Sequence, residues 1–84
     1  MATMESGLRQ KIERDPEAEY DVIVRTSGDS EPVARFCAHS GMTIHREFKL
    51  VPGLAVTGKG RDLLTLAENP RVLSIEADRE VRVQ

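Results

Sequence analysis

The sequence predicts one small α+β domain in which four strands and two helices follow one another in the order β-α-β-β-α-β. Its 84 residues allow a single modest hydrophobic core. Short runs of β-formers alternate with runs in which apolar residues have helical spacing, and glycine or proline separates most of them. Charged residues at 31% and hydrophobic residues at 39% are typical of a soluble globular domain.

The N-terminal segment is expected to form a helical extension of marginal stability. Met4, Leu8 and Ile12 recur every four residues, which places them along one side of a helix. Asp15-Pro16 ends this pattern, because the residue before a proline avoids the helical region.

The first strand and the first helix of the main domain are predicted next. Tyr20–Thr26 is rich in apolar β-formers, which indicates a strand that lies centrally in a sheet. The helix is predicted to span Glu31–Ser40, with Asp29 or Ser30 as its N-cap. Gly41 suits the left-handed position at which such a helix ends.

The second half of the chain predicts a hairpin, a helix and a last strand. Thr43–Leu50 alternates in polarity like a half-buried strand, and a Val-Pro-Gly turn joins it to a short strand at Leu54–Thr57. Paired leucines place a helix at Arg61–Glu68, and Val72–Glu76 is the last strand. The charged segment 77–84 lacks a turn signal and is expected to be an extended tail.

This order of elements predicts a ferredoxin-like fold, also called a split βαβ arrangement. Right-handed crossovers would give a four-stranded antiparallel sheet with both helices on one face. Residues 1–18 would form the N-terminal extension, and residues 19–84 the domain. The second sheet face would stay uncovered, and Ile23 is a candidate for it because it is out of phase with the neighbouring valines.

Composition argues against several classes of function. The net charge of −2 and the lack of a basic stripe with aromatics disfavour nucleic-acid binding. Apolar runs fall far short of a membrane span, and Met1–Arg14 has no signal-peptide core. The chain as given is expected to be cytoplasmic, or secreted or periplasmic if it was trimmed from a larger precursor. Cys37 cannot form an internal disulfide and is expected to be a core residue.

Motifs for catalysis or cofactor binding fail in the sequence, so we expect no enzyme activity, cofactor or metal. Gly53–Gly60 resembles a phosphate-binding loop but lacks the Ser or Thr after its lysine. Cys37, His39 and His45 match no zinc spacing, and no Ser-His-Asp arrangement is suggested. An acyl-phosphate hydrolase would need a positioned asparagine, whereas Asn69 falls in a turn that ends a helix.

Residues Tyr20 to Gln84 as an ordered set resemble the inhibitor I9 family, the propeptides of subtilisin-like proteases. The matching stretches are Tyr20-Asp-Val-Ile-Val, Gly41-Met-Thr-Ile-His, Phe48-Lys-Leu-Val-Pro-Gly-Leu-Ala-Val and Leu63-Leu-Thr-Leu-Ala-Glu-Asn-Pro-Arg-Val-Leu-Ser-Ile-Glu-Ala-Asp. The resemblance implies a non-enzymatic inhibitor of a subtilisin-like serine protease. It implies further that the domain assists folding of its protease in the manner of an intramolecular chaperone, if it is a propeptide.

The resemblance also implies which residues would contact the protease. The tail would enter the active-site cleft like a bound product, with Val81, Arg82, Val83 and Gln84 in successive subsites and Val81 in an apolar one. Glu76 and Asp78 would meet the N-termini of surface helices on the protease, where carboxylates are favourable. The domain would then be monomeric when free.

An alternative function stays open at this point. A ferredoxin-like interaction or regulatory module would self-associate through the same uncovered sheet face. The two functions differ in the free protein, because only the second one requires a dimer.

Overall fold

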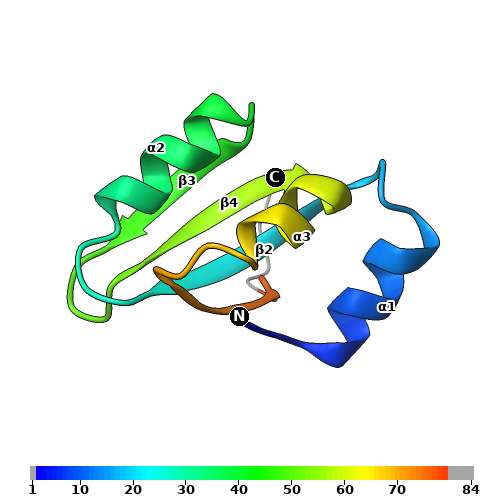
Figure 1. The fold of residues 1–84 in the computed structure, drawn as a ribbon, viewed down its shortest axis with the longest axis horizontal. Helices are drawn as coiled ribbons and strands as arrows, with labels where there is room; N and C mark the ends of the chain where they lie inside the picture. Colours follow the sequence, from blue (N-terminus) through cyan, green and yellow to red (C-terminus); the bar gives the residue numbers. More distant parts are fainter. Residues whose placement is uncertain (1, 80–84) are drawn as a thin grey trace.

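A computed structural model describes residues 2–79 of the 84-residue chain and has an α+β architecture with a small sheet and helices (Figure 1). The elements in chain order are β1 (Thr3–Met4), α1 (Ser6–Arg14), β2 (Glu19–Thr26), α2 (Glu31–His39), β3 (Thr43–Phe48), β4 (Gly53–Lys59), α3 (Gly60–Leu66) and β5 (Val72–Ala77). The helix and strand order predicted for the main domain is therefore present. None of the helices within residues 2–79 is long and apolar enough to cross a membrane.

The sheet differs from the predicted four-stranded antiparallel one. Within residues 2–79 it has five strands in the order β1-β5-β2-β4-β3, and β1 runs parallel to β5. The other three pairings are antiparallel, so the sheet as a whole is mixed. The extra strand follows from Met4, which was predicted to be helical but pairs in register with Ile75. Its pairing satisfies backbone groups of β5 that an edge strand would leave open.

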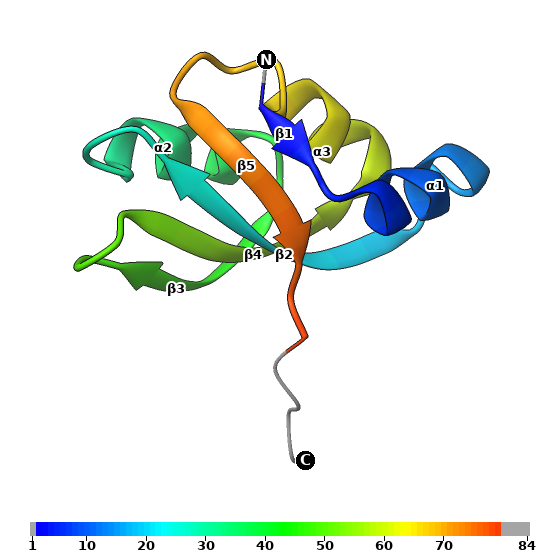
Figure 2. The same cartoon turned by 90° about the horizontal axis from the view of Figure 1, so that it is seen from below.

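The helices α2 and α3 cover one face of the sheet and enclose the core against it (Figures 1 and 2). The strand side chains that face these helices are fully or almost fully buried: Val22, Val24, Leu54, Val56 and Ile75. The helices contribute Val33, Cys37, Leu63 and Leu66 to the same cluster. Leu8 and Ile12 of α1 are buried there as well, so the N-terminal helix is packed rather than marginal.

Asp29 and Ser30, the two residues predicted as possible N-caps of α2, make different hydrogen bonds. Ser30 occupies the N-cap position, and the Oδ1 atom of Asp29 before it accepts a hydrogen bond from the Glu31 N–H at 3.0 Å. The Ser30 hydroxyl makes no cap and donates instead to Glu47 Oε2 at 2.6 Å. Gly41 follows the helix at φ 81°, as predicted for a helix that ends in the left-handed region.

The sheet face opposite α2 and α3, here called the open face, carries mostly polar side chains. Ile23 is half-buried there and pairs in register with Ala55, which is 5% exposed. The alternation predicted for Thr43–Leu50 is broken by a bulge at His45, because Ile44 pairs with Val56 and Arg46 pairs with Ala55. Ile44 and Arg46 therefore belong to opposite faces, whereas simple alternation had placed them on the same face.

Candidate functional site

The predicted contact residues lie where the chain leaves the sheet, but only some of them are described. Glu76 is within β5 rather than after it, is exposed, and pairs in register with Ile23 on the open face. Asp78 follows the strand directly, and its N–H donates to the Asp21 carbonyl at 2.9 Å. The tail residues Val81, Arg82, Val83 and Gln84 lie outside the described residues.

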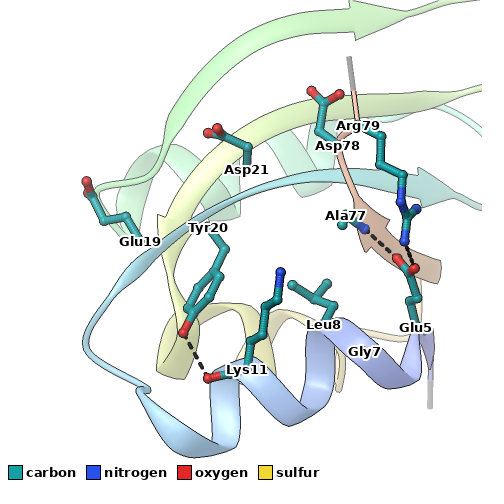
Figure 3. A pocket seen from close by; sticks show the side chains of 10 residues that line it. All are labelled: Glu5, Gly7, Leu8, Lys11, Glu19, Tyr20, Asp21, Ala77, Asp78 and Arg79. Atoms are coloured by element: carbon teal, nitrogen blue, oxygen red, sulfur yellow. Dashed lines mark hydrogen bonds and ion pairs between the residues drawn. The ribbon is translucent and has the colours of Figure 1, made fainter. Parts of the chain in front are cut away.

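Carboxylates gather at this end of the open face, which we call the tail end and define by Asp21, Glu76 and Asp78. Figure 3 shows the carboxylates of Asp21 and Asp78 projecting to the same side, away from α1. Glu76 shares that face because its register partner Ile23 lies two residues from Asp21 on β2. The two acids predicted from the sequence are therefore joined by a third, from a neighbouring strand.

A hydrogen-bonded row crosses three strands at the tail end. The Thr57 hydroxyl on β4 donates to Asp21 on β2, and His45 Nε2 on β3 lies 2.6 Å from the same hydroxyl oxygen. The hydroxyl stands between the imidazole and the carboxylate, so the carboxylate does not orient the imidazole as it would in a nucleophilic triad. This row positions polar groups, and it depends on strand pairing that local spacing does not set.

The side chain of Glu5 holds the point where the tail leaves the sheet (Figure 3). Its Oε1 accepts the Ala77 N–H at 2.9 Å, and its Oε2 forms an ion pair with Arg79. The Glu5 N–H donates to the Ile75 carbonyl at 3.1 Å. The hydrogen bond from Arg79, followed by the one from Ala77, lowers the pKa of Glu5 below its ordinary value of 4.5.

The contacts of the Glu5 carboxylate with Ala77 and Arg79, here called the clip by Glu5, continue the sheet where β1 has ended. The Asp78 N–H points toward β2, so the preceding N–H of Ala77 points toward the β1 edge of the sheet. Strand β1 ends at Met4, and the carboxylate of Glu5 accepts the Ala77 N–H on this side of β5. No local pattern in the sequence indicates this role of Glu5, because Glu5 is separated by 72 residues from the strand end that it contacts.

A cavity of about 330 Å³ lies between α1 and the ends of β2 and β5 (Figure 3). Leu8 and Lys11 of α1 line one side, and Tyr20 and Asp78 line the other. The Tyr20 hydroxyl lies 2.9 Å from the Lys11 carbonyl and 2.7 Å from the Asp15 carbonyl, which ties the end of α1 to β2. The mixture of acidic and basic groups gives the cavity no single ligand preference.

The opposite end of the open face is basic and apolar, and we call it the hairpin end after the β3–β4 turn. It comprises Arg25, Arg46, Phe48, Leu50 and Val51. The guanidinium carbons of Arg25 and Arg46 lie over the Phe48 ring, 5.1 and 5.6 Å from its centroid. Leu50 and Val51 in the turn are 100% and 60% exposed.

The other residues that were considered for catalysis or ligand binding contribute to packing and secondary structure. Cys37 is fully buried, and burial raises its pKa to about 11, which disfavours the reactive thiolate. The segment resembling a phosphate loop is strand β4 and the start of α3, and no loop separates Lys59 from Gly60. A Cβ at Gly58 would lie 2.8 Å from Met42 Cγ, and one at Gly60 would lie 2.9 Å from Ile12, so packing explains both glycines.

Comparison with known proteins gives no family for this chain. No protein-family model matches it, and no curated protein matches it at the significance required.

Proposed function

We propose that this protein inhibits a subtilisin-like serine protease and resembles the inhibitor I9 propeptides in fold and mode of binding. The observation that carries the proposal is the point at which the chain leaves the sheet. The chain leaves the sheet after Ala77 at the acidic tail end of the open face (Figure 2). A partner docked on that face would therefore have the tail beside it.

The strand order supports the ferredoxin-like part of the proposal. Without β1, the order is β5-β2-β4-β3, which puts the first and third strands of the βαββαβ unit at the centre. Both crossover helices lie on one face, so the other face is available to a partner (Figure 2). The pair β1 and α1 is an addition to this unit, which agrees with the resemblance beginning only at Tyr20.

The acids of the tail end would orient the docked protease. Helix N-termini carry unpaired N–H groups and partial positive charge, and a carboxylate is favourable near them. Glu76 is exposed and available for such a contact, and the half-buried Asp78 has its backbone held by Asp21. Each contact would contribute roughly 0.3–1 kcal/mol at an exposed site.

The tail would complete inhibition by occupying the cleft as an extended strand. Backbone hydrogen bonds to the enzyme would supply affinity, and Val81 would fill an apolar subsite. The clip by Glu5 would help, because it fixes the direction in which Asp78 and Arg79 leave the sheet. Fixing that direction before binding lowers the entropy lost when the tail enters the cleft.

Deletion of Val81–Gln84 tests this proposal. The deletion should raise the inhibition constant against subtilisin about a hundredfold or more, since the extended ligand and its apolar anchor are both lost. The melting temperature should stay unchanged, because the core is built from residues up to Ile75. Val81→Asp is the finer variant, and Val81→Ile is its matched control. Equal inhibition by the deletion variant and the parent would refute the proposed role of the tail.

A second function is favoured by the opposite charges on the open face. Two copies related by a two-fold axis could place the acidic tail end of one copy against the arginines of the other, which gives a self-complementary contact. This would be a regulatory module that self-associates through its sheet. Sedimentation velocity separates the two functions, because the inhibitor is expected to be a monomer at micromolar concentration whereas the module is a dimer.

A further inference from the structure

The β3–β4 turn presents large apolar side chains to solvent without a structural need for them. The fold uses the backbone of Val51, whose carbonyl accepts a hydrogen bond from Arg25 Nη1 at 3.1 Å. The side chains of Leu50 and Val51 project outward, although turns usually carry polar residues, glycine or proline. Leu73, 56% exposed, lies on β5 at the same end, since Ser74 beside it pairs with Arg25. The adjacent exposed side chains of Leu50 and Val51 are therefore a candidate surface for contact with another molecule.

A hollow lies beside these apolar residues. Its volume is about 450 Å³, and Arg25, Arg46, Phe48 and Leu50 are among the residues that line it. The Phe48 ring is half-buried and lies under both guanidinium groups. The site therefore combines an apolar surface with two guanidinium groups, each of which has several donors for hydrogen bonds.

The charge of this hollow is positive despite the net negative charge of the chain. Glu47 is the acid among its lining residues, and its carboxylate accepts hydrogen bonds from Ser30 at 2.6 Å and from Lys49 at 2.9 Å. Lys49 therefore balances Glu47. Within residues 2–79, no carboxylate lies within ion-pair distance of Arg25. Arg25 therefore leaves a local excess of positive charge beside an apolar surface.

We propose that the hairpin end binds an acidic segment of a partner protein that also carries a large apolar side chain. A carboxylate of the segment would pair with the guanidinium of Arg25 in a bidentate manner. Its apolar side chain would enter the hollow against Phe48 and Leu50. An anionic membrane fits less well, because the arginines are few and the chain has a net charge of −2. The residues of this site differ from those named for the proposed inhibition, which lie at the opposite end of the open face.

The test measures fluorescence anisotropy of the labelled peptide Asp-Glu-Phe-Asp-Leu-Glu with the full chain at low ionic strength. A peptide with lysine at every acidic position is the reference. The acidic peptide should bind at least about tenfold more tightly than the reference, and added salt should reduce this difference. Equal binding of the two peptides would overturn the proposal.

Two variants locate the site. Leu50→Ser combined with Val51→Ser should weaken binding of the acidic peptide about tenfold, through loss of apolar area at positions that the core does not use. Arg25→Glu should weaken it at least as much. Arg14→Glu is the matched control, since it makes the same charge change at an exposed position on α1 and should leave binding unchanged. Unchanged binding in the first two variants would overturn the proposal.

Two further results would assign the surface to another occupant and overturn the proposal. One is binding to phosphatidylserine vesicles that is tighter than binding to the peptide and is lost in the Leu50 and Val51 variant. The other is dimerisation in sedimentation velocity that the same variant abolishes. Inhibition of subtilisin by this variant should equal that of the parent, so a failure here is distinguishable from a failure of the inhibitor proposal.

Discussion

The two ends of the open face differ in charge and in the way their side chains are held. The tail end carries the carboxylates of Asp21, Glu76 and Asp78, whereas the hairpin end carries Arg25 and Arg46. Strand β2 joins both ends, since Asp21 and Arg25 are separated by about 13 Å at roughly 3.3 Å per residue. One short strand thus presents opposite charges to a partner.

The two ends also differ in how far the fold itself uses their side chains. At the tail end, Asp21 bonds to Thr57, and Glu5 holds the backbone of Ala77, so polar groups there are fixed by other strands. At the hairpin end, Leu50 and Val51 expose apolar area that adds little to the stability of the fold. The tail end therefore offers a partner fixed polar groups, whereas the hairpin end offers exposed apolar side chains.

The largest effect that distinguishes the ends is expected from Glu76→Ala combined with Asp78→Ala. Inhibition of subtilisin should weaken about tenfold, because both helix contacts are removed at roughly 1 kcal/mol each or less. The melting temperature should change little, since neither carboxylate belongs to the core. Arg25→Glu at the hairpin end is the comparison, and it should inhibit like the parent. If the two variants inhibit equally well, the acids are ordinary surface charges.

A smaller effect is expected when the clip by Glu5 is removed. Glu5→Ala should speed amide exchange of Ala77 about fivefold, because its N–H loses the carboxylate acceptor. Glu5→Gln keeps an oxygen acceptor but loses the ion pair with Arg79, so it should have an intermediate rate. Exchange at Val56 in the central strand β4 serves as the internal control. An unchanged rate at Ala77 in Glu5→Ala would show that the clip does not hold the strand end.

The smallest effect is expected when the pH is lowered, because the fold then loses stabilising contacts of Glu5 near the tail end and of Glu47 near the hairpin end. The hydrogen bonds from Arg79 and Ala77 lower the pKa of Glu5, and those from Ser30 and Lys49 lower the pKa of Glu47, in each case below 4.5. A lowered pKa in the folded state means that each carboxylate stabilises the fold fully above pH 4.5 and loses this contribution as the pH falls through its lowered value.

Carboxyl carbon NMR shifts measured between neutral pH and acid would check both groups. Each midpoint should lie below 4.5. Arg79→Gln should raise the midpoint of Glu5 alone, and Ser30→Ala should raise that of Glu47 alone. A midpoint of Glu5 at 4.5 or higher in the parent would contradict the clip.

Much of the fold was predictable because its signals are local. The apolar run at Tyr20–Thr26, the spacing of Val33 and Cys37, and Gly41 after the helix each reflect the geometry of a single element. The element ends lie within about two residues of those predicted for α2, β5 and most of the others. Of the candidate site, only Glu76 and Asp78 were named beforehand among the described residues, and they were named through the resemblance to the inhibitor I9 family.

The sequence by itself determined the order of the elements from β2 onward and the apolar faces of most of them, since these depend on neighbours a few residues apart. Only the tertiary structure decided that Met4 joins a strand, because that choice rests on pairing with Ile75 at the far end of the chain. The same holds for the clip between Glu5 and Ala77 and for the row from Asp21 to His45. Strand register and one bulge bring these groups together, and both are set by contacts across the whole sheet rather than by local spacing.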